Sequence, residues 1–196
     1  MNKEKVKSTG STLFVARAGI IAAVYVVLTV FISAFNLASG AIQIRISEAL
    51  CILPIFTSAA IPGLAIGCFL SNLLTGCAIQ DIIFGSLATL IGAIWSYVLR
   101  KHKFLATLPP VISNALIVPW VLRYVYEFTF IYKGIDLSIP FFILTVAIGE
   151  VISVCFLGTM LRKALEPIKA ILFGVEPQEV QSQKVELQEK QPQEAQ

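Results

Sequence analysis

Residues 43–54 read QIRISEALCILP and place an arginine and a glutamate, Arg45 and Glu48, three positions apart in an otherwise apolar segment. Side chains with this spacing share one face of a helix, so the two form either a local ion pair or one wall of a polar pocket open to the outside. A charged side chain inside a bilayer costs about 2.5–3.5 kcal/mol even on insertion scales, which makes a functional pocket the working hypothesis.

A second candidate is Glu150, which follows Gly149 in an apolar run that contains no basic residue, 139–161. A carboxylate at that depth must lie against a cavity or a partner group, or it must bind a proton. The alternative is a protonated glutamate that donates a hydrogen bond to a neighbouring helix.

Three further polar residues lie in apolar segments. Asn72 and Asn114 carry amides that need partners, and each serves equally well as a ligand group or as a hydrogen-bonding link between helices. Asp81 begins an apolar run, where a carboxylate commonly caps a helix N-terminus, and we interpret it in that way.

The composition places these residues in a membrane protein. The chain has 196 residues, of which 57% are hydrophobic and 14% charged, about half the charged fraction of an average soluble domain. No GxxxxGK[ST], HExxH or GxSxG motif occurs in the sequence, so we expect neither ATP binding through a P-loop nor an enzyme, and no cofactor or metal. The four cysteines lack CxxC spacing and are interpreted as packing residues.

Hydropathy predicts an all-α bundle of six membrane helices. Four runs are long enough to cross about 30 Å of hydrocarbon: 14–35, 82–99, 109–126 and 139–161. The segment 42–75 is too long for one span and is broken by Pro62 and Gly63, so we expect two short helices, 42–56 and 61–75.

Basic residues set the expected orientation. They gather near the N-terminus, at 100–103 and at 162–169. With six spans all three groups lie on one side, so the positive-inside rule predicts that both termini are cytoplasmic.

We therefore expect a cytoplasmic segment at 1–13, a six-span substrate-binding domain at 14–165, and a cytoplasmic, largely disordered Gln/Glu-rich tail at 166–196. The first run is longer than the hydrophobic core of a signal peptide, which favours an uncleaved first span.

Small residues on the first span suggest a close helix contact. Ala18 with Ala22, and Gly19 with Ala23, both have small-xxx-small spacing. Packing within the chain and contact with a partner subunit explain this pattern equally well.

Several segments in this order carry a family resemblance: IQIRISEAL, AAIPGLAIGCFLSNLLTG, DIIFGSLATLIGA, LPPVISNALIVP and AIGEVIS. Together, from about Val15 to Leu165, the chain resembles the queuosine-precursor transporter family. That resemblance implies a substrate-binding (S) component of an energy-coupling factor (ECF) transporter in the prokaryotic plasma membrane. The partners it implies are a small-molecule solute, a membrane coupling subunit, two ATPase subunits and the lipid bilayer, with no nucleic acid.

The implied solute is a 7-deazaguanine such as preQ0 or preQ1, captured from outside and released inward by ATP hydrolysis on the partners. A carboxylate accepts the adjacent N–H groups of a guanine-like edge, so we expect Glu48 and Glu150 to recognise the solute and Arg45 to orient Glu48 or bind an oxygen. The other substrate-binding residues we expect are Asn72 or Asn114 at the carbonyl and Trp120 or Tyr124 against the ring. The resemblance also implies that the Ala18/Ala22 face, with Gly19 and Ala23 beside it, contacts the coupling subunit.

Two other functions remain compatible with these residues: an S component for another vitamin-like solute, and a stand-alone carrier that uses Glu150 as its proton site. A scaffold without a solute, in which Arg45 and Glu48 are a structural pair, is a third.

Overall fold

The computed structural model describes residues 3–34 and 45–174. The chain divides into two compact units, residues 1–162 and 163–196. The first unit contains most of the helices and all of the expected binding residues, and the second is described by itself.

Among the described residues, four helices are long and apolar enough to cross a membrane. The first is Ser11–Ser33 within α1 (Lys3–Ser33), and the second is α3 (Ile79–Val98). The third, Leu105–Tyr124, comprises the short turn η2 (Leu105–Thr107) and α4 (Leu108–Tyr124). The fourth, Ser138–Phe173, begins with α5 (Ser138–Glu150). These helices agree with the four long spans expected from hydropathy.

After α5 the backbone changes geometry. A π-helical segment, η3 (Val151–Leu157), follows Glu150 directly and leads into α6 (Gly158–Leu165). Because a π-helix is wider than an α-helix and is uncommon outside functional sites, this change marks the neighbourhood of Glu150.

In the second unit the described residues include the turn η4 (Glu166–Ile168) and α7 (Lys169–Phe173). The first part of the expected tail, 166–173, is therefore helical. The sequence there, EPIKAILF, has a proline in its first turn followed by helix-forming apolar residues, unlike the Gln/Glu-rich stretch after it. Residues 175–196 of the expected tail lie outside the described residues.

The two short helices expected in 42–75 are η1 (Ile46–Ile55) and α2 (Ala60–Leu74). η1 is a 3₁₀ helix of 10 residues, which at about 2.0 Å per residue is roughly 20 Å long. α2 has 15 residues and at 1.5 Å per residue is about 22 Å long. Both are shorter than the hydrocarbon core, so length alone does not make them spans.

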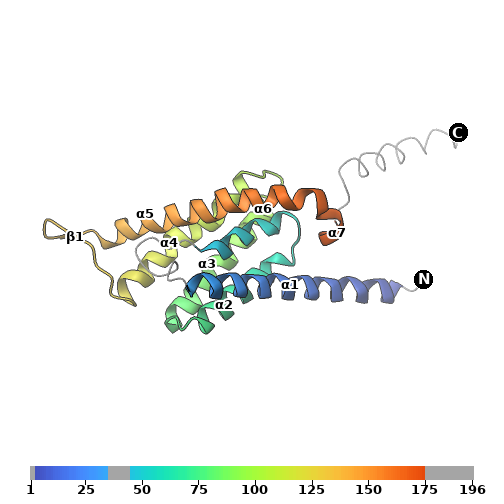
Figure 1. Ribbon diagram of the computed structural model, residues 1–196, viewed down its shortest axis with the longest axis horizontal. Helices are drawn as coiled ribbons and strands as arrows, with labels where there is room; N and C mark the ends of the chain where they lie inside the picture. The colour runs from blue at the N-terminus through green and yellow to red at the C-terminus, as the bar shows by residue number, and fades with distance from the viewer. Residues whose placement is uncertain (1–2, 35–44, 175–196) are drawn as a thin grey trace. The chain divides into compact units, whose positions relative to one another are not determined.

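Packing places η1 in the interior of the first unit. Helices adjacent in the chain pack together from α1 to α5, and η1 contacts α1, α2, α3 and η3. Figure 1 shows η1, in cyan, between α1 and the run that begins with α5. All residues from Ser47 to Pro54 are buried, so any polar side chain on η1 lies within the bundle.

The α1–α2 contact uses the small residues of the first span. A Cβ at Gly63 would lie 2.8 Å from the carbonyl oxygen of Ala18, and one at Gly67 would lie 3.1 Å from that of Ala22. Both alanines are buried here. The expectation that Ala18 and Ala22 contact a coupling subunit is therefore wrong, because their face is already occupied by α2.

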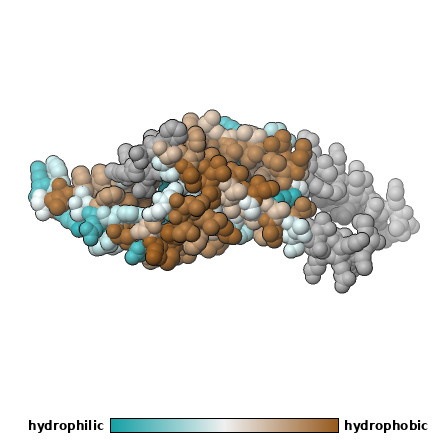
Figure 2. Space-filling view, turned by 60° about the horizontal axis from the view of Figure 1, so that its bottom comes forward, coloured by the Kyte–Doolittle hydropathy of each residue, from teal (hydrophilic) through white to brown (hydrophobic). Residues whose placement is uncertain are grey.

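The outer surface of the first unit is largely apolar, as a membrane protein requires. Figure 2 shows a broad hydrophobic surface, with hydrophilic residues gathered at the end that carries the β-hairpin in Figure 1. The hairpin joins β1 (Ile131–Tyr132) to β2 (Ile135–Asp136). Its turn residues, Lys133 and Gly134, both have positive φ, the geometry that matches the twist of a two-residue hairpin.

Candidate functional site

Glu48 lies on the interior helix η1 and is 1% exposed. Its Oε1 accepts a hydrogen bond from the hydroxyl of Tyr25 on α1, and its Oε2 accepts one of 2.9 Å from the thiol of Cys51. Next to it, the hydroxyl of Thr29 donates to that of Ser47 over 2.8 Å. These bonds fix Glu48 between α1 and η1, and they satisfy a carboxylate that burial would otherwise make costly.

Glu150 occupies the end of α5 and is 7% exposed. Glu48 and Arg45 act on its carboxyl group electrostatically, and the side chain of Asn114 lies within hydrogen-bonding range of it. Within the described part of the chain, neither Oε2 of Glu150 nor Nδ2 of Asn114 has a hydrogen-bonding partner. An acceptor and a donor are therefore buried near one another, and they can bond to each other or to a further polar group placed between them.

Arg45 directly precedes η1 and is half-buried. It interacts electrostatically with Asp81, Glu48 and Glu150. One guanidinium thus stands among three buried carboxylates that come from η1, α3 and α5. This arrangement gathers the expected residues Arg45, Glu48 and Glu150 into one polar cluster.

Asp81 belongs to the same cluster, contrary to its interpretation as a helix cap. The N-cap residue of α3 is Ala78, and no side chain caps it. Asp81 is 5% exposed, and its Oδ2 accepts a 3.0 Å hydrogen bond from the hydroxyl of Tyr126 beyond the end of α4. That hydroxyl in turn accepts a 3.2 Å hydrogen bond from the N–H of Ala78.

Asn72 and Asn114 are both buried, at 2% and 4% exposure. Nδ2 of Asn72 donates a long, 3.7 Å hydrogen bond to the sulfur of Cys68. Both amides face the interior of the first unit, Asn72 from α2 and Asn114 from α4.

Trp120 and Tyr124 lie elsewhere, so the expectation that they stack on a ligand in this cluster is wrong. Their side chains are 52% and 66% exposed, and their rings stack on each other with centroids 6.0 Å apart. They line an open, apolar groove of about 460 Å³ on the outer face of α3 and α4.

Sequence reasoning missed Tyr25, Asp81 and Tyr126 as members of the cluster. Tyr25 sits in an apolar run where an aromatic residue is ordinary core. For Asp81 a signal existed, since it is one of three charged residues between Ala18 and Leu99. Tyr126 gave no signal, because tyrosines at the outer end of a span are common interfacial anchors.

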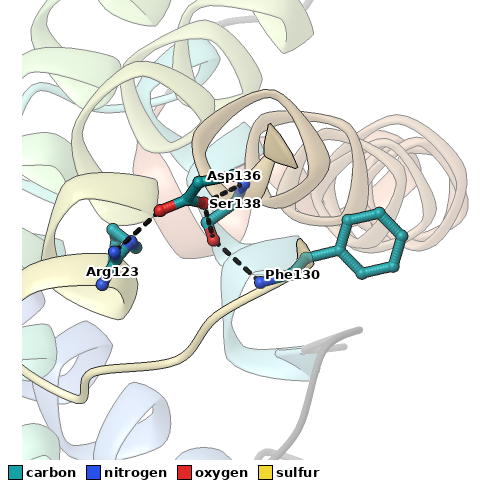
Figure 3. A network of polar contacts seen from close by, with 4 residues as sticks. All are labelled: Arg123, Phe130, Asp136 and Ser138. Atoms are coloured by element: carbon teal, nitrogen blue, oxygen red, sulfur yellow. Dashed lines mark hydrogen bonds and ion pairs between the residues drawn. The ribbon is translucent and has the colours of Figure 1, made fainter. Parts of the chain in front are cut away.

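The segment after α4 carries a separate polar network, drawn in Figure 3. Nη2 of Arg123 lies 2.8 Å from Oδ2 of Asp136, and the N–H of Ser138 donates to Oδ1 over 2.9 Å. The Ser138 hydroxyl donates to the same oxygen and accepts the N–H of Phe130 over 2.8 Å. The Ser138 bonds, and then Arg123, lower the pKa of Asp136 to about 2.

A family model described as QueT transporter matches residues 15–167. The matched region contains all of the buried polar residues described above. No curated protein and no solved structure matches the chain.

Proposed function

The chain belongs to the QueT transporter family, and on that premise we propose that it is the substrate-binding component of an energy-coupling factor transporter for a 7-deazaguanine, preQ0 or preQ1. It is a transport protein rather than an enzyme, and it crosses the cell membrane more than once. We propose the identity of the solute, the residues that contact it and the subunits that assemble with the chain.

The observation that carries the proposal is the pair formed by Glu150 and Asn114. Both side chains are more than nine-tenths buried, and both present polar atoms without partners among the described residues. A guanine-like edge supplies the missing groups, since its N–H donates to a carboxylate and its carbonyl accepts from an amide. Hydrogen bonds that involve a charged group are the stronger ones, so this contact favours tight binding.

Glu48 and Arg45 support the pair from the same cluster. Glu48 already accepts hydrogen bonds from Tyr25 and Cys51. Its proposed role is therefore to orient Arg45 through its negative charge, and not to bind the whole hydrogen-bonding edge of the ligand. Arg45 balances part of the negative charge around the solute.

The proposed topology has six spans with both termini in the cytoplasm. It requires η1 and α2 to cross as a short pair, which a tilted or locally thinned bilayer accommodates. In this arrangement the basic groups near the N-terminus, at 100–103 and at 162–169 all face the cytoplasm.

The proposed contact with the membrane coupling subunit uses Gly19 and Ala23. Both are exposed on α1, on a different face from Ala18 and Ala22, and nothing lies within 4 Å of a Cβ built at Gly19. A face of small residues lets a partner helix approach closely. Energy then comes from ATPase subunits bound to that partner.

Binding of preQ0 and preQ1 to the purified protein tests the proposal. Glu150→Gln keeps the shape of the side chain and removes its charge, and we expect about 10- to 100-fold weaker binding with assembly on the coupling module retained. Glu127→Gln is the matched control, because Glu127 is exposed outside the helices. Unchanged affinity for Glu150→Gln would contradict the proposed site.

A stand-alone proton-coupled carrier is the second candidate, and the burial of Glu150 favours it. Uptake into vesicles separates the two functions. A carrier of this kind works without ATPase subunits and stops when the proton gradient is dissipated, whereas an S component requires ATP. A ligand panel on the same protein distinguishes a deazaguanine from another vitamin-like solute.

A further inference from the structure

Asp81 presents an oxygen that its structural role does not use. The bond from Tyr126 engages Oδ2, whereas Oδ1 has no hydrogen-bonding partner in the part of the chain that the structure describes. The side chain is 95% buried. Burial of a carboxylate oxygen without a hydrogen-bond donor costs free energy. The bond from Tyr126 to the other oxygen nevertheless keeps the side chain in this position.

Gly85, one turn further along α3, lies beside this oxygen and has no side chain to cover it. A Cβ built at Gly85 would lie 3.5 Å from Oδ1 of Asp81 and 3.1 Å from Nδ2 of Asn72. Both polar atoms therefore lie close to the backbone of Gly85, and a methyl group there would press against Nδ2 of Asn72. Among the described residues, Nδ2 of Asn72 makes only its long bond to Cys68, so its second N–H is open to a further acceptor.

Asp81 with Asn72 repeats the chemistry of Glu150 with Asn114. In each pair a buried carboxylate oxygen without a partner among the described residues stands near a buried carboxamide nitrogen. Arg45 interacts electrostatically with both carboxylates. Arg45 thus links the two pairs electrostatically, and each pair offers one acceptor and one donor.

We propose that Asp81 and Asn72 form a second recognition pair, which binds the opposite hydrogen-bonding edge of the same planar heterocycle that Glu150 and Asn114 hold. The assignment rests on the proposed function. It narrows the solute to a flat heterocycle with a donor next to an acceptor on each of two edges. A 7-deazaguanine has this pattern: a ring N–H beside a carbonyl on one edge, and a pyrrole N–H beside a ring nitrogen on the other.

Two substitutions test the second pair in different ways. Asp81→Asn removes the charge and half of the acceptor capacity. Gly85→Ala adds a methyl group that presses on Nδ2 of Asn72 and covers Oδ1 of Asp81, while it changes the chemistry of neither group. Asp136→Asn is the matched control for the first, because Asp136 lies in the exposed hairpin. Affinity for preQ0 and preQ1 is measured on each full-length purified variant, together with its thermal unfolding midpoint.

We expect Asp81→Asn and Gly85→Ala each to weaken binding by about tenfold or more, and Asp136→Asn to leave it unchanged. A deazaguanine methylated on its pyrrole nitrogen adds a second measurement. The wild-type protein should bind this analogue more weakly than the unmethylated compound. In one variant, either Asp81→Asn or Glu150→Gln, the two compounds should bind equally, because that variant lacks the carboxylate that receives the N–H.

The outcomes are distinct. Wild-type protein that binds neither deazaguanine overturns the proposed function and this assignment with it. Wild-type binding that both Asp81→Asn and Gly85→Ala leave unchanged overturns the second pair alone. If Asp81→Asn fails to fold, Gly85→Ala decides the question, since it alters no polar group.

Discussion

The hydroxyl of Tyr25 on α1 donates a hydrogen bond to Oε1 of Glu48 on η1, 23 residues further along the chain. Both side chains are 1% exposed. The bond ties the first long span to the interior 3₁₀ helix, and it satisfies part of a carboxylate that lies beyond the reach of water. The packing of α1 against η1 is therefore coupled to the position of Glu48.

Tyr25→Phe should destabilise the protein, because it removes the donor and leaves a buried carboxylate oxygen unsatisfied. We expect a loss of about 1–3 kcal/mol in the free energy of unfolding. Chemical denaturation of the purified protein in detergent measures it. Tyr132→Phe is the control, since Tyr132 lies exposed in the hairpin; equal losses for both variants would contradict a specific role for the Tyr25 hydroxyl.

Gly67→Ala should also destabilise the protein, through packing. The added Cβ would lie 2.8 Å from Cβ of Tyr25 and 3.1 Å from the carbonyl oxygen of Ala22, so α1 and α2 must separate. Overpacking of this kind costs about 1–3 kcal/mol. Gly19→Ala, with nothing within 4 Å of its new Cβ, should leave unfolding unchanged or raise stability slightly. A neutral Gly67→Ala would mean that the helices adjust freely at this crossing.

Ala23→Leu should separate assembly from binding. Ala23 is exposed on α1, so a larger side chain there should reduce co-purification with the coupling subunit while solute affinity stays at its wild-type value. Ala22→Leu places the same side chain in the α1–α2 contact and should instead lower the unfolding midpoint. If Ala23→Leu assembles normally, the partner contact lies on another face.

The long helices were predictable because an unbroken apolar run of about 20 residues has few other stable structures in a membrane. Pro62 and Gly63 likewise indicated the break between η1 and α2. The 3₁₀ geometry of η1 and the π-helical turn after Glu150 were not predictable, since both depend on how η1 packs against its neighbours rather than on local propensity.

For the candidate site, charge in an apolar run drew attention to Arg45, Glu48 and Glu150, which interact electrostatically in the structure. Trp120 was misplaced because its residue type was considered without its helical phase. It follows Asn114 by six positions, which at about 100° per residue turns it roughly 240° away from the amide. Asp81 was misinterpreted because a carboxylate at a helix start looks the same in sequence whether it caps the helix or faces the interior.

Helical phase also predicts opposite effects for two residues of α4. Asn114→Ala should weaken solute binding by about tenfold or more, because the buried amide loses its contact with the ligand. Trp120→Ala should leave the dissociation constant unchanged, since the ring lies in the outer groove. Isothermal titration of both variants checks this, and a binding defect in Trp120→Ala would return that residue to the site.

The hairpin network should lose its order in acid. The pKa of Asp136 is about 2 in the folded protein, against an ordinary value of 3.8, because Ser138 and Arg123 bind the ionised form. A pKa that folding depresses contributes stability above the unfolded value, and this contribution disappears as the pH falls from about 4 to about 2.

The N–H groups of Ser138 and Phe130, which donate within the network, report on it through hydrogen exchange. Their protection should stay constant between pH 5 and pH 7 (about one unit or more above both pKa values) after correction for intrinsic exchange, and should fall below about pH 4. In Ser138→Ala the loss of protection at the N–H of position 138 should move to higher pH, because the hydroxyl that donates to Asp136 is removed. The N–H of Phe130 loses its acceptor in this variant and is therefore a reporter in the wild-type protein alone. Protection that persists to pH 2 in the wild-type protein would show that the carboxylate does not hold the hairpin.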